Sequence, residues 1–193
     1  MKYELLRFAH ILGAILLGAG VIGVWFSDFR SRQLKEFPQF SEVVRNIPIF
    51  YDGLIVPGSV LLFASGTWLI IEFWGGWAFV KVPWLLGMVV LYAFELVVGN
   101  IVTRPYFLRL HRLAKDLLPK GEFTPQLKET RSEKVPTFTH FLDLPILVLF
   151  VALGTITPDT WTFFIVAVIF VLLVAATLTI CIPNRYPWAA ESD

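Results

Sequence analysis

The sequence predicts an all-α, polytopic transmembrane helix bundle that forms a single domain over residues 1–193. Hydrophobic residues make up 56% of the chain and charged residues only 16%, against about 45–50% and about 25% in soluble domains. The mean hydropathy is +0.70, so the chain needs the lipid bilayer as its partner and solvent. The net charge of +1 gives no reason to expect a nucleic-acid partner, and the single cysteine excludes an internal disulfide or a cysteine metal cluster.

Five apolar segments are long enough to cross a bilayer, which takes about 20 helical residues. The fourth is the least obvious, because its uncharged run from Leu144 would reach only about 22 Å as a helix, short of the ~30 Å hydrocarbon core. We therefore expect it to begin near Pro136; alternatively, Asp143 caps a shorter helix. The predicted spans are about 5–27, 49–73, 82–103, 136–157 and 160–183, with a cytoplasmic basic loop at 104–135.

Basic residues predict the orientation of these spans. In a five-span arrangement all but three of the 16 Lys and Arg, namely Lys2, Arg7 and Lys81, lie on one side of the membrane. The positive-inside rule then predicts an N-terminus outside and a C-terminus inside the cytoplasm. Within the basic loop, residues 106–118 carry apolar side chains at helical spacing, which predicts an extension of the third span or an interfacial helix.

His10 is the first ionisable group expected inside the membrane, where such groups are costly and usually have a role. Gly13 and Gly20 share its helical face. Small residues beside a histidine leave room for a flat macrocycle, and a neutral imidazole can be an axial ligand of haem iron. Alternatively, the glycines allow close helix packing and His10 hydrogen-bonds to a neighbouring helix.

A second polar stripe lies on the third span, where Lys81, Met88, Tyr92 and Glu95 fall on one face at 100° per residue. Lys81 or Met88 could oppose His10 on a haem iron, with Tyr92 in the same cofactor site. Alternatively, Met88 and Tyr92 only pack, and Lys81 anchors the helix at the interface. Glu95 lies deeper and is a candidate proton-handling group.

The fourth span carries His140 and Asp143, which share a helical face. An Asp143 carboxylate that accepts the imidazole N–H would fix its tautomer. Asp52, at the cytoplasmic end of the second span, could join them. We expect His140 to lie on the order of 15 Å from the depth of His10, too far for both to bind one iron. Either the chain has two sites, or His140 and Asp143 form a structural or proton-handling pair that Asp52 could join.

Three short segments resemble known bacterial membrane proteins: residues 7–20 (RFAHILGAILLGAG), 77–81 (WAFVK) and 133–137 (EKVPT). They are similar to a bacterial family of predicted integral membrane proteins of unknown function, to HemJ-type protoporphyrinogen oxidases and, more distantly, to CopD-like membrane proteins. The resemblance implies a multi-pass protein of the bacterial cytoplasmic (inner) membrane. It also implies that His10 and Lys81 contact haem b.

Two interpretations follow. In the first, the chain is a haem b-binding integral membrane protein, a redox or electron-transfer component and, if an enzyme, a membrane oxidoreductase. In the second, it is a non-catalytic accessory subunit of a membrane complex or a small proton-linked carrier, with other membrane subunits or a second copy of the chain as partners. The sequence names no substrate for either.

Overall fold

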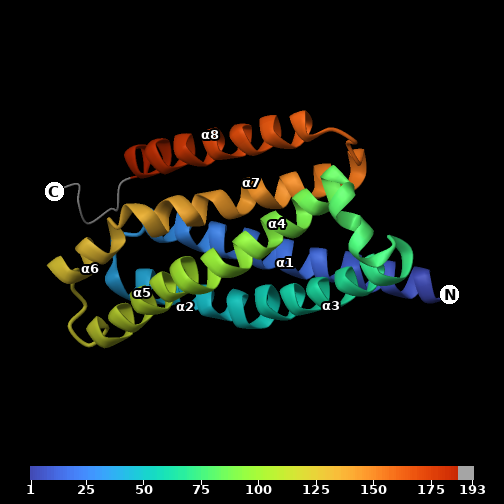
Figure 1. The fold of residues 1–193 in the computed structure, drawn as a ribbon. Coiled ribbons are helices and arrows are strands. Elements are labelled where there is room, and N and C mark those ends of the chain that lie inside the picture. Colours follow the sequence, from blue (N-terminus) through green and yellow to red (C-terminus); the bar gives the residue numbers. More distant parts are fainter. Residues whose placement is uncertain (187–193) are drawn as a thin grey trace.

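A computed structural model describes residues 1–186, which form helices and no strand (Figure 1). The predicted all-α class is therefore confirmed for this part of the chain. Two of the helical segments are π-helical (η1 and η3) and one is a 3-10 helix (η2). The elements are α1 (Lys2–Arg32), α2 (Phe37–Phe50), η1 (Tyr51–Ile55), α3 (Val56–Phe73), η2 (Gly76–Lys81), α4 (Pro83–Val98), η3 (Gly99–Thr103), α5 (Arg104–Leu117), α6 (Pro125–Arg131), α7 (Lys134–Ile156) and α8 (Trp161–Arg185).

Five helices are long and apolar enough to cross a membrane, as predicted. Two are much longer than one span requires: Phe37–Phe73 has 37 residues and Pro83–Leu117 has 35. At 1.5 Å per residue each helix is about 50–55 Å long, whereas the hydrocarbon core is ~30 Å thick. One end of each must therefore project beyond the lipid. The fourth helix begins at Lys134, so both His140 and Asp143 lie within it.

The five helices run side by side, with the start of α1 and the end of α8 at opposite ends of the bundle (Figure 1). One end holds the N-terminus, the η2 turn and the α7–α8 turn. The other end, which we call the basic end, holds α2, α5, α6 and the α1–α2 connection. The basic end contains most of the Lys and Arg residues. The positively charged residues are thus segregated as the orientation prediction requires.

Glycines bring α1 and α3 into close contact. A Cβ atom on Gly13 would lie 2.9 Å from the backbone nitrogen of Leu62, and one on Gly58 would lie 2.6 Å from that of Leu17. Real Cβ atoms do not approach backbone atoms so closely, so each site requires glycine. In a bilayer, where apolar surface gives helices no reason to associate, such close packing supplies the attraction. These glycines therefore fix the position of α1 against α3.

The basic end has an apolar core of its own, built between α1, α2, α5 and α6. Fully buried aromatic and aliphatic side chains fill it: Val24, Leu34, Phe37, Phe40, Val44, Ile47, Tyr51, Tyr106, Phe107, Leu110, Ala114 and Leu127. The apolar stripe predicted at residues 106–118 lies in α5, which continues the third spanning helix through η3. That stripe contacts protein, so α5 is an extension of the span and not a separate interfacial helix.

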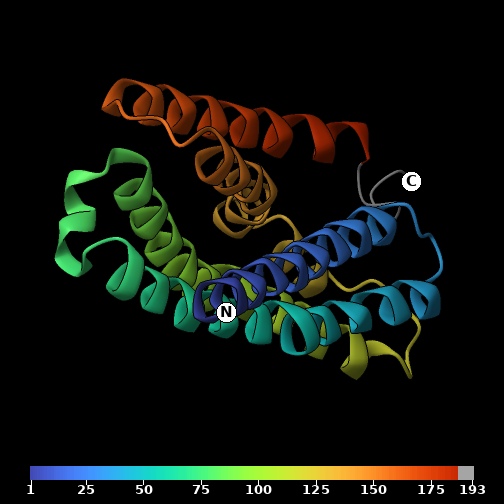
Figure 2. The ribbon, with the colours of Figure 1, turned by 90° about the vertical axis from the view of Figure 1, so that its right-hand side faces the viewer.

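α8 lies at the edge of the bundle and packs mainly against α7 (Figures 1 and 2). Its contact with α7 and α4 forms a second apolar core that includes Leu142, Ile146, Leu153, Val171 and Ala175. Most of its remaining apolar side chains are exposed, as expected for a helix facing lipid.

Candidate functional site

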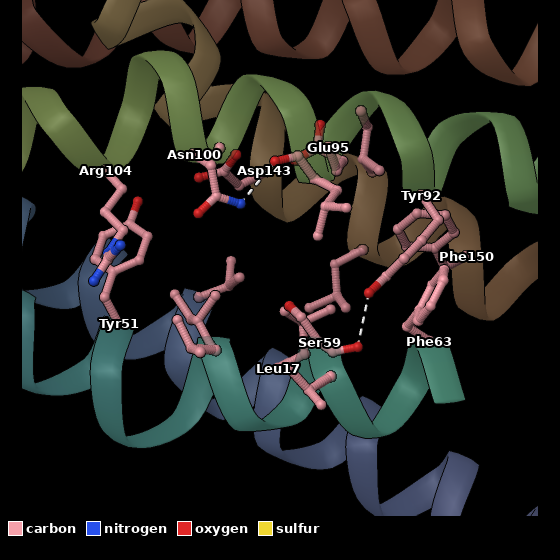
Figure 3. Close-up of a pocket in the computed structure, with 18 residues that line it drawn as sticks. Leu17, Tyr51, Ser59, Phe63, Tyr92, Glu95, Asn100, Arg104, Asp143 and Phe150 are labelled. Carbon is pink, nitrogen blue, oxygen red and sulfur yellow. Dashed lines mark hydrogen bonds between the residues drawn. The ribbon is translucent and has the colours of Figure 1, made fainter. Parts of the chain in front are cut away.

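A cavity of about 420 Å³ lies in the membrane-spanning part of the bundle, between α1, η1, α3, α4, η3 and α7 (Figure 3). Its volume is in the range of small-molecule sites, about 300–1,000 Å³. Its wall is mostly apolar. The lining residues are Leu17, Val21, Tyr51, Ile55, Val56, Ser59, Val60, Phe63, Tyr92, Glu95, Leu96, Gly99, Asn100, Arg104, Asp143, Ile146, Leu147 and Phe150.

Two carboxyl groups from different helices meet on the wall of this cavity. Glu95 of α4 and Asp143 of α7 both line the cavity (Figure 3), and their side chains interact by a hydrogen bond. Oε1 of Glu95 is buried and has no hydrogen-bond partner among N–H and O–H groups in residues 1–186. Two carboxylates at this distance in an apolar site cannot both ionise at low cost, so the pair holds at least one shared proton.

Tyr92 connects the two long helices across the cavity. Its hydroxyl donates a hydrogen bond to the Ser59 carbonyl of α3, at 2.7 Å (Figure 3). Its ring stacks on Phe63 with centroids 6.4 Å apart and planes 18° apart. One turn of α4 separates Tyr92 from Glu95, so this aromatic pair lies beside the carboxyl pair.

The end of the cavity nearest the basic end is closed by an ion pair. Nη2 of Arg104 donates to Oδ1 of Asp52 at 2.7 Å, which joins α5 to η1. Both partners are partly exposed, at 34% and 61% respectively. Asn100, also on the wall, uses its side-chain N–H₂ to bond to the Leu96 carbonyl of its own helix. The positive charge that lines the cavity is therefore already matched by a carboxylate.

π-helical turns border the cavity on both long helices, with η1 on one side and η3 on the other. Gly99 is the first residue of η3 and Pro105 follows its last residue by two positions. A π turn is often found where a helix wall is shaped around a site. Tyr51 and Ile55 of η1 and Gly99 and Asn100 of η3 all line the cavity.

A second cluster of buried polar side chains lies outside the cavity, at the basic end. Asp28 and Arg32 of α1 form an ion pair at 2.9 Å with side chains only 1% and 2% exposed. Nε2 of His140 is 3.7 Å from Oδ2 of Asp28. The Trp25 indole N–H donates to the His140 carbonyl, and Phe107 packs edge-on against the imidazole. This group is enclosed by aromatic rings.

These contacts differ from the predicted group of His140, Asp143 and Asp52. The structure brings His140 to Asp28, Asp143 to Glu95 and Asp52 to Arg104. His140 and Asp143 share one helix, but each faces a different neighbouring helix. The carboxylate beside His140 was missed, although Asp28 and Arg32 at i,i+4 spacing near a helix end are a recognisable ion-pair signal.

His10 lies between α1 and α3, where its Nδ1 is 3.1 Å from the Ser65 hydroxyl oxygen. A Cβ on Gly66 would lie 3.1 Å from His10 Cε1, so the ring rests on the α3 backbone. Gly13 and Gly20, which could have left room for a macrocycle, are in contact with α3 and η1. The space beside His10 on this face is therefore filled by protein, and the geometry matches the helix-packing alternative.

Lys81 and Met88 are not placed near His10 by any contact that the structure describes. Lys81 ends the η2 segment, and Val82 is extended before α4 begins at Pro83. The predicted stripe therefore breaks between Lys81 and the rest. Met88 packs beside α7, with its Cε 3.8 Å from the position of a Cβ on Gly154. Tyr92 and Glu95 are the members of the stripe that line the cavity.

The described residues contain no group of three His, Cys, Asp or Glu side chains that could hold a metal ion. Together, five spanning helices and a cavity between them define a polytopic α-helical membrane protein. The chain belongs to the family described as "Predicted integral membrane protein (DUF2269)", whose match covers residues 4–158. This match ends before α8. No curated protein and no solved structure matches the chain.

Proposed function

We propose that the protein is a small proton-linked membrane carrier whose ligand binds in the cavity beside Glu95 and Asp143. The observation that supports this most is the carboxyl pair on the wall of a cavity of about 420 Å³ inside a spanning bundle. Ionisable groups at this depth are expensive, and those that line a cavity usually mark a ligand or proton pathway. Among the described residues, the cation that lines the cavity, Arg104, is bound to Asp52 and not to this pair.

The chemistry of the pair is the exchange of a proton against a ligand. An empty cavity favours the pair with its shared proton, because the apolar wall disfavours a second negative charge. A ligand that is better accommodated by the ionised pair releases a proton when it binds, and reprotonation releases the ligand. Binding and protonation are then linked in both directions.

A titration of the carboxyl groups tests this proposal. The purified protein in liposomes is titrated while the infrared carbonyl band of protonated carboxyl groups is recorded. We expect a band that disappears as the pH rises, and that is lost in Glu95→Gln and in Asp143→Asn. Asp159→Asn, which changes an exposed carboxyl in the α7–α8 turn, is the matched control and should keep the band. A band unaffected by all three substitutions would contradict proton handling and favour a non-catalytic accessory subunit of a membrane complex.

For the orientation, we propose an N-terminus outside and a C-terminus inside the cytoplasm of a bacterial cell, in its inner membrane. The segregation of Lys and Arg at the basic end supports it. In a Cys181→Ser background, a cysteine at position 120, between α5 and α6, should react with an impermeant maleimide only after the cells are opened. Labelling in intact cells would reverse the orientation.

Haem b binding is the second candidate function. The hydrogen bond between His10 and Ser65 supports it, because it orients the imidazole. A histidine that binds a metal is usually held by such a hydrogen bond at its other ring nitrogen. The packing of α1 on α3 leaves no space for a macrocycle on that face, so the residues present do not fit the group there. A Soret band in the purified protein that is lost in His10→Ala would support haem binding. A protein still colourless after addition of haemin would contradict it.

A further inference from the structure

The cavity opens sideways toward the position of the lipid chains. Three of its lining side chains are exposed on the outside of the bundle: Val60 by 63%, Phe63 by 60% and Leu96 by 43%. They belong to α3 and α4, which are joined through η2 (Figure 2). Because the hydrocarbon core surrounds these residues, a ligand that enters here comes from the bilayer. It must therefore carry a large apolar surface.

The charges around the cavity select the sign of the ligand. In residues 1–186 no ion pair joins Glu95 or Asp143 to a cation, and Arg104, the cation among the described lining residues, is held by Asp52. Once the pair gives up its shared proton, the cavity carries a net negative charge in apolar surroundings. Such a charge is stable only beside a cation.

Aromatic rings on the same wall favour a large, weakly hydrated cation. Phe63 and Tyr92 are stacked, Phe150 lies at the same end of the cavity, and Tyr51 lies at the other end (Figure 3). Organic cations bind to the faces of such rings. An inorganic ion would instead need several oxygen ligands, and no group of His, Cys, Asp or Glu in residues 1–186 offers a metal site.

We propose that the cavity binds a lipophilic organic monocation, taken from the bilayer between α3 and α4, in exchange for the proton shared by Glu95 and Asp143. This rests on the proposed proton-linked function and names its substrate class. One cation enters and one proton leaves, so the charge inside the cavity does not change. No covalent bond is formed or broken.

The exchange predicts the direction of the pH dependence. Rising pH removes the proton from the pair, so affinity for a cation increases with pH. The other titratable or charged groups that face the pair are Tyr51 of η1, Tyr92 of α4 and the Arg104–Asp52 ion pair. The tyrosines are neutral near neutral pH and the ion pair is internally matched, so the Glu95–Asp143 pair governs the change.

Tetraphenylphosphonium is the probe for this test, measured by titration calorimetry with the full chain in lipid nanodiscs. We expect saturable binding that strengthens with pH, with about one proton released per bound cation. Glu95→Gln and Asp143→Asn should each weaken binding at least ten-fold, whereas Asp159→Asn should not. Tetraphenylborate, which has the same shape and the opposite charge, should not bind when it is titrated alone.

Two results would overturn the proposal: absence of tetraphenylphosphonium binding by a folded protein, or equally tight binding of tetraphenylborate titrated alone. Thermal unfolding of each variant establishes that it is folded. The infrared titration distinguishes failure of the proposed substrate class from failure of the proton-linked function. If the pair titrates but the phosphonium does not bind, the substrate class is wrong and the proton-linked function stands; if the pair does not titrate, both fail.

A bulky side chain at the opening tests the route. Val60→Trp adds a large ring to an exposed position at the edge of the cavity, away from the carboxyl pair. It should slow association of the phosphonium several-fold. Val166→Trp, on the exposed face of α8, is the matched control and should leave the rate unchanged. Equal association rates in the two variants and the unmodified chain would overturn access from the bilayer.

Discussion

Asp28 and Asp143 are both aspartates that the fold encloses, but their surroundings are opposite. Asp28 is paired with Arg32 on its own helix and is surrounded by aromatic rings at the basic end. Asp143 meets a second carboxyl group, Glu95, on the wall of a cavity. One site is matched in charge and filled by protein; the other is unmatched in charge and next to open space.

This difference separates a structural role from a functional one. A matched buried ion pair is costly to disturb, because removal of one partner leaves the other charge in a poor environment. An unmatched carboxyl pair gives the fold little and is instead available to a proton or a ligand. Substitutions at the two sites should therefore change stability in opposite directions.

The largest effect is expected for Asp28→Asn. It removes the carboxylate that neutralises Arg32 and lies 3.7 Å from His140, and should lower the free energy of unfolding by about 3–5 kcal/mol. Denaturant titration of the protein in a fixed detergent measures this. Asp159→Asn, at an exposed turn, is the control. Equal stability of the two variants would remove the distinction between the buried ion pair and a surface group.

A smaller effect of opposite sign is expected for Asp143→Asn. An amide at this position can donate to Glu95 and relieves the crowding of two carboxyl groups. We expect the free energy of unfolding to rise by about 0.5–2 kcal/mol, as is common when a functional site is relaxed. The same denaturant titration measures it. A loss of stability as large as that of Asp28→Asn would mean that the pair is part of the structural framework.

The smallest effect on stability is expected for Asp52→Asn, because its ion pair with Arg104 is partly exposed. Such pairs contribute about 0–1 kcal/mol. The substitution nevertheless frees the Arg104 charge at the end of the cavity. It should therefore weaken binding of tetraphenylphosphonium while leaving the unfolding transition nearly unchanged. Unchanged binding would show that Arg104 does not influence the charge of the cavity.

Much of this architecture can be predicted from composition and hydropathy. The five spans, the early start of the fourth helix near Pro136 and the helical stripe after Arg104 all follow from local patterns. Such patterns report which residues enter the membrane. They do not report how far each helix is rotated about its axis or which neighbour it meets. That is why Glu95 and Asp143 could be named singly but not as a pair.

A local signal would have improved one of the interpretations. Pro83 favours the first turn of a helix and an extended residue before it, which places the start of α4 after Lys81 and breaks the predicted stripe. Gly13 and Gly58 show the limit of such signals. The sequence pattern is the same whether a small residue faces a cofactor or the backbone of another helix.

The π segments have a consequence for insertions and deletions. A π turn holds one residue more than the α-helix that would cover the same stretch. Deleting one residue between Gly99 and Thr103 would therefore restore regular α-helix over that stretch and leave the segment beyond it in place. Tyr106 and Phe107 would stay in the apolar core of the basic end, and Arg104 would stay beside Asp52. The same deletion in a regular α-helical part of the span would instead rotate everything beyond it by about 100°. The π segments are therefore the places where each long helix tolerates loss of one residue.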